Sequence, residues 1–136
     1  MSTNPYAAYS TVGTTTADPI TLTTMLFDGA IKAIRRAKLH FEAQNREGFL
    51  HETNRAYLIV GELLATLDLE QGELPKQLNA LYGYCLRLLT EATIGDTAKL
   101  DEVAVHISKI GASWKQATAS IKAGSGSPLG ATEALA

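Results

Sequence analysis

Apolar residues recur with a helical period in four successive segments of the chain. In the segment 74–92 they form one broad stripe, which consists of Leu74, Leu78, Leu81, Tyr82, Cys85, Leu88, Leu89 and Ala92. The ten residues between Lys76 and Arg87 carry no charge. The apolar arc approaches ~200° around the helix, whereas a surface helix needs only about 100°. This helix is therefore expected either to lie in the middle of a bundle or to offer surplus apolar surface to a partner.

The other three segments predict helices before and after this one. Asp18 can cap the start of the first helix, and Pro19 suits its first turn. The four predicted helices cover about residues 18–43, 47–67, 74–93 and 96–117. Four amphipathic helices joined by short turns indicate an all-α fold, an antiparallel four-helix bundle.

The chain is expected to form a single bundle domain over residues 18–117. Residues 1–17 are rich in Ser, Thr, Ala and Gly without any period, which predicts a mobile N-terminal arm. That arm carries two large aromatic residues, Tyr6 and Tyr9. Residues 118–136 contain the run GSGSP, and we expect a disordered C-terminal tail there.

The first two predicted helices carry residues that suggest how they contact other helices or a partner. The first carries small residues at Gly29, Ala30, Ala33 and Ala37, which predict the close approach of another helix. The second contains four consecutive apolar residues at 57–60, which on a helix cannot all face one way. Leu58 points away from the stripe, so this helix is also expected to carry surplus apolar surface.

Composition and charge exclude several classes of protein. The formal net charge is −2, and the one basic cluster (Lys32, Arg35, Arg36 and Lys38) is interpreted as a solvated helix face, so nucleic-acid binding is not predicted. The single cysteine, Cys85, excludes an internal disulfide. The N-terminus lacks the basic start and apolar run of a signal peptide, and no apolar segment reaches membrane-spanning length. We expect a cytosolic protein without membrane insertion.

No pattern for catalysis or for a metal is present. A di-iron bundle uses Glu-x-x-His pairs that face inward, but Glu47 with His51 and Glu102 with His106 are spaced i, i+4 and point away from the apolar stripes. No nucleophile motif or phosphate-binding glycine loop occurs. The chain is therefore predicted not to be an enzyme, with no catalytic residue, metal site or cofactor.

Motifs spread over residues 6–116 resemble one family. They comprise the arm Tyr6-Ala-Ala-Tyr9, the run DPITLTTMLFDGAIKAIRRAK at 18–38, Leu67-Asp68 with Glu73, Leu78 with Leu81, Tyr82 and Tyr84, the segment 87–92, Asp96, Glu102-Val103 and Trp114-Lys115. In this order they resemble the flagellin-specific export chaperones, the FliS family of the bacterial flagellar secretion system. The chain departs from the family pattern in its compact turn before Pro75, at Cys85 and at Leu88.

The resemblance implies a cytosolic chaperone that binds the C-terminal disordered segment of flagellin. Such a chaperone prevents premature polymerisation and helps to deliver its client to the flagellar type III export gate. It is expected to be a monomer that binds one client molecule. The candidate flagellin-binding groove on the second and third helices consists of Leu58, Ile59, Leu81, Tyr82, Tyr84 and Leu88. Tyr6 and Tyr9 of the arm are candidates for docking on this groove and for contact with the export gate.

Two alternatives remain open from the sequence. A self-associating structural bundle would bury the surplus apolar face in a homodimer. A bundle that binds a regulator would use the same groove for a different helix.

Overall fold

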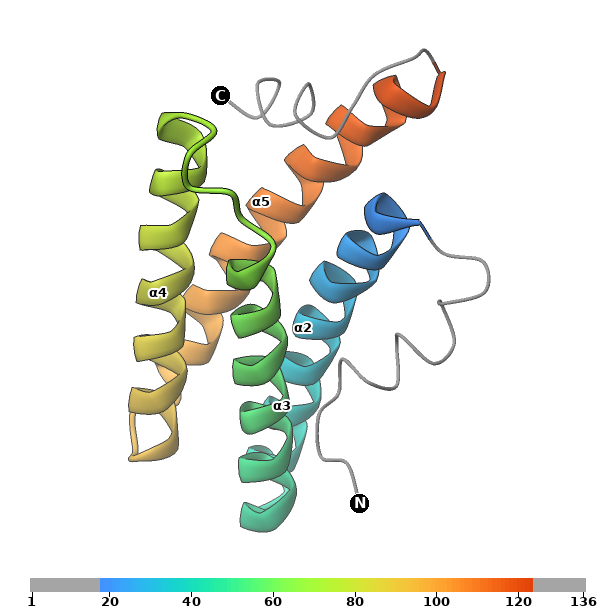
Figure 1. Ribbon diagram of the computed structural model, residues 1–136. Helices are drawn as coiled ribbons and strands as arrows, with labels where there is room; N and C mark the ends of the chain where they lie inside the picture. Colours follow the sequence, from blue (N-terminus) through green and yellow to red (C-terminus); the bar gives the residue numbers. More distant parts are fainter. Residues whose placement is uncertain (1–17, 124–136) are drawn as a thin grey trace, which may run out of the picture.

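The computed structural model describes residues 18–123, which form four helices. The helices are α2 (Pro19–Glu42), α3 (Arg46–Ala65), α4 (Glu73–Thr93) and α5 (Ala98–Ala123). Successive helices run in opposite directions and pack side by side, as Figure 1 shows. The predicted all-α bundle is therefore confirmed.

Local sequence explains where the helices begin and turn. The Asp18 carboxylate accepts a hydrogen bond of 2.8 Å from the Thr21 N–H and caps α2, as predicted, with Pro19 in the first turn. Asn45 caps α3 in the same way through the Gly48 N–H at 3.1 Å. The turns before α4 and α5 each contain a glycine with positive φ, Gly72 at 107° and Gly95 at 126°.

Each helix packs against its neighbours in the chain, and α5 closes the bundle by packing against α2. The α2–α3 pair makes the most extensive contact. The small residues of α2 that were predicted to permit close approach of another helix (Gly29, Ala30, Ala33 and Ala37) are all buried. Another small residue, Gly111 of α5, is buried against Phe27. A Cβ atom added at Gly111 would lie 3.3 Å from the Phe27 side chain, so this glycine permits the α2–α5 approach.

The core is apolar and draws on all four helices. Its largest fully buried side chains include Leu26, Ile34, Phe49, Ile59, Leu63, Leu88, Leu89, Leu100 and Ile107. At one end of the bundle, Phe27 and Trp114 contact each other with ring centroids 6.3 Å apart. The Trp114 indole N–H donates to the Thr24 hydroxyl at 3.0 Å, so its polar atom is satisfied where α2 meets α5.

The last helix differs from the expectation at both ends. It begins at Ala98, so Asp96 lies in the turn, where its carboxylate is 3.8 Å from the Lys99 ammonium. It continues to Ala123, six residues beyond the expected end at 117. Ala117 and Thr118 are buried in this last part, and Thr118 donates to the Trp114 carbonyl at 2.9 Å. Contacts with the bundle thus extend the helix into a sequence whose composition favours a tail.

Candidate functional site

The six candidate groove residues divide into two groups in the structure. Ile59, Tyr82 and Leu88 lie in the core with exposed fractions of 0, 3 and 2%. Leu58, Leu81 and Tyr84 are partly exposed. Only the second group is accessible to a partner in this conformation. The accessible apolar surface is therefore smaller than the broad apolar arc of α4 predicted.

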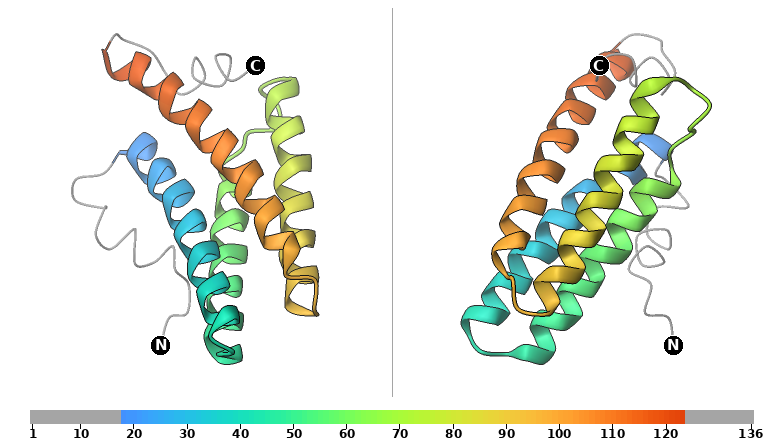
Figure 2. Two further views of the ribbon diagram at one scale, coloured as in Figure 1. Left: turned by 180° about the vertical axis from the view of Figure 1, so that it is seen from behind. Right: turned by 90° about the vertical axis from the view of Figure 1, so that its left-hand side faces the viewer.

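The spacing between α4 and α5 changes along their length. The two helices meet near the turn that joins them and diverge toward the N-terminal end of α4, as the views in Figures 1 and 2 agree. Tyr82, Cys85 and Leu89 of α4 stay buried, whereas Leu78 and Leu81 on its N-terminal half are only partly buried. We call the partly exposed set Leu78, Leu81, Tyr84, Ile110 and Trp114 the α4–α5 opening.

Tyr84 is tied to α5 within this opening. Its hydroxyl donates to Glu102 Oε2 at 2.6 Å, and His106 Nε2 lies 3.3 Å from the same oxygen. The Tyr84 and His106 rings meet edge to face at 5.9 Å, and the Arg87 guanidinium lies 5.6 Å from the Tyr84 ring centroid. The hydrogen bond to Glu102 raises the pKa of Tyr84, and together with His106 it lowers the pKa of Glu102. The sequence indicated a surface pair of Glu102 and His106 but not their aromatic partner, which comes from another helix.

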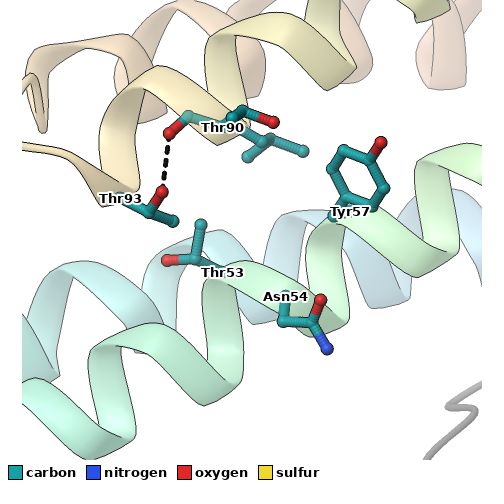
Figure 3. Close-up of a pocket in the computed structure, with 6 residues that line it drawn as sticks. Thr53, Asn54, Tyr57, Thr90 and Thr93 are labelled. Atoms are coloured by element: carbon teal, nitrogen blue, oxygen red, sulfur yellow. Dashed lines mark hydrogen bonds between the residues drawn. The ribbon is translucent and has the colours of Figure 1, made fainter.

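A second hollow lies between α3 and α4, and sequence reasoning missed it. Its volume is about 240 Å³, and it is lined by Thr53, Asn54, Tyr57, Leu89, Thr90 and Thr93. Figure 3 shows the Tyr57 ring from α3 across from the threonines of α4. Tyr57 is 40% exposed, so the hollow has an accessible aromatic wall beside hydroxyl groups. The only sequence signal is a threonine at the edge of each apolar stripe.

Glu52 is a further residue that the sequence did not single out. Its side chain is 8% exposed on α3, and no described residue hydrogen-bonds to its buried Oε1 atom. The position three residues after Phe49 and four before Ala56 places it in the apolar stripe, which is the signal that could have found it. A buried carboxylate oxygen without a partner lowers stability.

The remaining predictions concern the two tyrosines of the arm, metal binding and membrane insertion. Tyr6 and Tyr9 lie outside residues 18–123, so their docking stays a prediction. Among the residues described, no group of three or more His, Cys, Asp or Glu side chains is placed to hold a metal ion. None of the four helices is both long and apolar enough to cross a membrane in this part of the chain.

The part of the chain that the structure describes is a bundle of four helices with apolar side chains of α3, α4 and α5 partly exposed. Partly exposed apolar helix faces are surfaces on which amphipathic segments of other polypeptides can dock. The family model of flagellar protein FliS matches residues 2–121. The flagellar secretion chaperone FliS of Bacillus subtilis is 37% identical over 115 residues, which cover 84% of this chain and 86% of that protein. The Escherichia coli and Salmonella typhimurium chaperones of the same name are 36% and 37% identical, over 70% and 74% of this chain and 72% and 76% of theirs.

The chain therefore belongs to the FliS family of flagellar secretion chaperones. Members of this family are chaperones and not enzymes, in agreement with the prediction from sequence.

Proposed function

We propose that this protein binds the C-terminal disordered segment of flagellin in the cytosol, prevents its premature polymerisation and assists its delivery to the flagellar export gate. One protein molecule binds one flagellin molecule. Family membership supports the chaperone role, and the α4–α5 opening supports a polypeptide client. The client contacts proposed here are Leu58 on α3 and Leu81 and Tyr84 on α4.

The observation that carries the proposal is the partial exposure of Leu81, which lies on the same helical face of α4 as the buried Leu88. Side chains at this position of a closed bundle are buried, as Leu88 is seven residues further along. Leu81 is instead partly exposed, and α5 diverges from α4 toward the N-terminal end of α4, as Figures 1 and 2 show. An amphipathic segment of the client can complete the bundle here by laying its apolar face against the opening.

The energetics fit a chaperone that must release its client. Burial of four to six apolar side chains contributes about 6–15 kcal/mol before costs. The loss of conformational entropy when the disordered segment becomes ordered offsets several kcal/mol of this favourable free energy. The loss of translational and rotational freedom on association offsets a similar amount. The net affinity is thus moderate, which permits transfer at the export gate.

The test is to place a charge in the client contacts. Leu58→Asp and Leu81→Asp are expected to weaken the binding of a flagellin C-terminal peptide about tenfold or more, because the carboxylate must be desolvated in the complex. Isothermal titration calorimetry measures the dissociation constant and the stoichiometry. Tyr84→Asp is less informative, since it would place a second carboxylate beside Glu102 and disturb the α4–α5 contact.

Ile94→Asp is the matched control, because Ile94 is 82% exposed in the turn between α4 and α5. It makes the same apolar-to-acidic change away from the proposed contacts and is expected to leave the dissociation constant unchanged. Equal binding by all three variants, or a peptide that fails to bind the wild-type protein, would reject the proposed function. Light scattering of the free protein and of the complex separates a one-to-one chaperone from a self-associating bundle.

The N-terminal arm has a proposed part in the same process. We propose that Tyr9, with Tyr6 beside it, docks on the apolar surface of α3 and α4 in the free protein and is displaced by flagellin. A tethered segment competes at high effective concentration even when its own contacts are weak. Once released, the arm is available to the export gate.

A further inference from the structure

A groove on the α2–α5 seam lies between different helices from the proposed client contacts. Its volume is about 510 Å³, and the residues that line it include Ile31, Lys32 and Arg35 of α2 and Ile107, Gly111 and Ala112 of α5. Gly111 is buried, and a Cβ atom added to it would lie 3.3 Å from the Phe27 side chain. The neighbouring Ala112 is exposed and small, which leaves the groove open to solvent along α5.

Two ion pairs join α2 to α5, of which one lines this groove and the other lies further along the two helices. Asp28 pairs with Lys115 at 2.6 Å, and Lys38 pairs with Asp101 at 2.5 Å. The hydrogen bond to Asp101 and its charge raise the pKa of Lys38. At 1.5 Å per residue, the pairs are separated by about 15 Å along α2 and about 21 Å along α5. A helix of about 10–14 residues spans that distance.

The cations on the rim of the groove are not matched by carboxylates of the bundle. Lys32 and Arg35 are exposed, and neither forms an ion pair with any residue among 18–123. The one carboxylate that lines the groove, Asp28, is already neutralised by Lys115. The groove thus carries two uncompensated positive charges on a chain whose formal net charge is −2.

We propose that the α2–α5 groove is a second docking site, which accepts an acidic amphipathic helix of another protein. Small apolar residues of that helix lie against Ile31 and Ala112, which are partly exposed and exposed, respectively. Its carboxylates, spaced three or four residues apart, pair with Lys32 and Arg35, which have the same spacing on α2. The charge on the rim selects an acidic helix over a neutral one, and the narrow floor selects small side chains.

The experiment uses the full chain and a designed peptide. The probe is a fluorescein-labelled helix of about 14 residues with an alanine face flanked by glutamates. Its counterpart has each glutamate replaced by lysine. Fluorescence anisotropy is expected to give saturable binding of the acidic peptide, no binding of the basic one, and weaker binding as salt increases. Equal binding of both peptides, or of neither, would overturn the proposal.

Two variants locate the binding, each with a matched control. Lys32→Glu combined with Arg35→Glu is expected to weaken the binding of the acidic peptide about tenfold or more. Lys76→Glu combined with Arg87→Glu on α4 makes the same change in net charge and is expected to have little effect. Ala112→Phe fills the groove and should also abolish binding, whereas Ala80→Phe on the exposed face of α4 should not. Equal loss in a variant and its control would show that the seam is not the site.

Competition separates this site from the proposed client surface. A flagellin C-terminal peptide is expected to leave the acidic peptide bound, and the Lys32 and Arg35 double variant is expected to bind flagellin as the wild type does. If flagellin displaced the acidic peptide, the α2–α5 groove would be part of the flagellin-binding site, and the proposal of a separate docking site would be wrong.

Discussion

Leu63 and Leu81 have the same side chain and lie on neighbouring helices, but only Leu63 is fully enclosed. Leu63 is 1% exposed, whereas Leu81 is partly exposed at the α4–α5 opening. Leu63→Ala is therefore expected to cost about 2–5 kcal/mol of stability, and Leu81→Ala less than about 1 kcal/mol. Urea denaturation followed by circular dichroism measures both. A cost for Leu81→Ala as large as that for Leu63→Ala would mean that Leu81 is a core residue.

Cys85 is a sensitive residue-scale probe because it is the only cysteine and is fully buried. Burial raises the pKa of its thiol from 9.0 to about 11. Below about pH 9 the thiol is protonated in both states. As pH rises from about 9 to about 11, the unfolded thiol ionises first, so the free energy of unfolding falls. Burial raises the pKa of Tyr82 as well, which acts in the same direction.

The measurement is chemical denaturation of the wild type and of Cys85→Ala at several pH values. The variant is expected to lose less stability than the wild type over this alkaline range. Ellman's reagent should react with Cys85 at pH 8 only after unfolding. Rapid modification of the folded protein would contradict the buried position of the thiol.

At the scale of the element, polar contacts join α4 to α5 close to the turn between them, and the Tyr84–Glu102 hydrogen bond is the shortest of these contacts. The Tyr84 hydroxyl bridges the helices through Glu102, and that bond lowers the Glu102 pKa. Tyr84→Phe keeps the ring contacts but removes the bridge, so it is expected to lower the melting temperature at pH 7. The pKa of Glu102 is lower in the folded protein than its ordinary value of 4.5 in the unfolded chain. The ionised carboxylate therefore stabilises the fold at pH values above 4.5, and this stabilisation is lost as the pH falls through the pKa of the folded protein.

The difference in melting temperature between wild type and Tyr84→Phe should therefore shrink as the solution is acidified below about pH 4.5. Tyr57→Phe on α3 is a useful comparison, because Tyr57 is 40% exposed and lines the hollow between α3 and α4, whereas Glu102 is on α5. Its effect is expected to be small and independent of pH. If the difference in melting temperature between the wild type and Tyr84→Phe stayed constant down to pH 3, the stabilisation by the Tyr84 hydroxyl would not depend on ionised Glu102, and the prediction would be wrong.

At the scale of the whole molecule, the proposed arm competes with the client. Deletion of residues 1–15 is expected to speed flagellin association or tighten binding, because the apolar surface is no longer covered. The free truncated protein should also bind more of an environment-sensitive dye. Stopped-flow fluorescence and dye titration measure the two effects. Unchanged kinetics, affinity and dye binding would show that the arm does not cover the surface.

Much of the fold was predictable because helix formation depends on local pattern. Asp18 with Pro19 and the glycines at the turns mark where helices begin or end, and the period of apolar residues identifies each inner face. The candidate site was less predictable. Tyr82 and Leu88 lie on either side of the same arc as Leu81, yet neighbouring helices cover the first two and not the third. A helical wheel gives the angle of a side chain but not the coverage along the axis.

By itself, the sequence determined four helices, the broad apolar face of α4 and the likeness to one family, since each follows from the order and spacing of residues. Only the tertiary structure decided which apolar residues remain accessible, because that depends on how the neighbouring helices cover each side chain. It also divided the basic cluster of α2, since Lys38 meets Asp101 of α5 while Lys32 and Arg35 border an open groove. Contacts between residues distant in the chain depend on the crossing of helices, and no local pattern encodes that geometry.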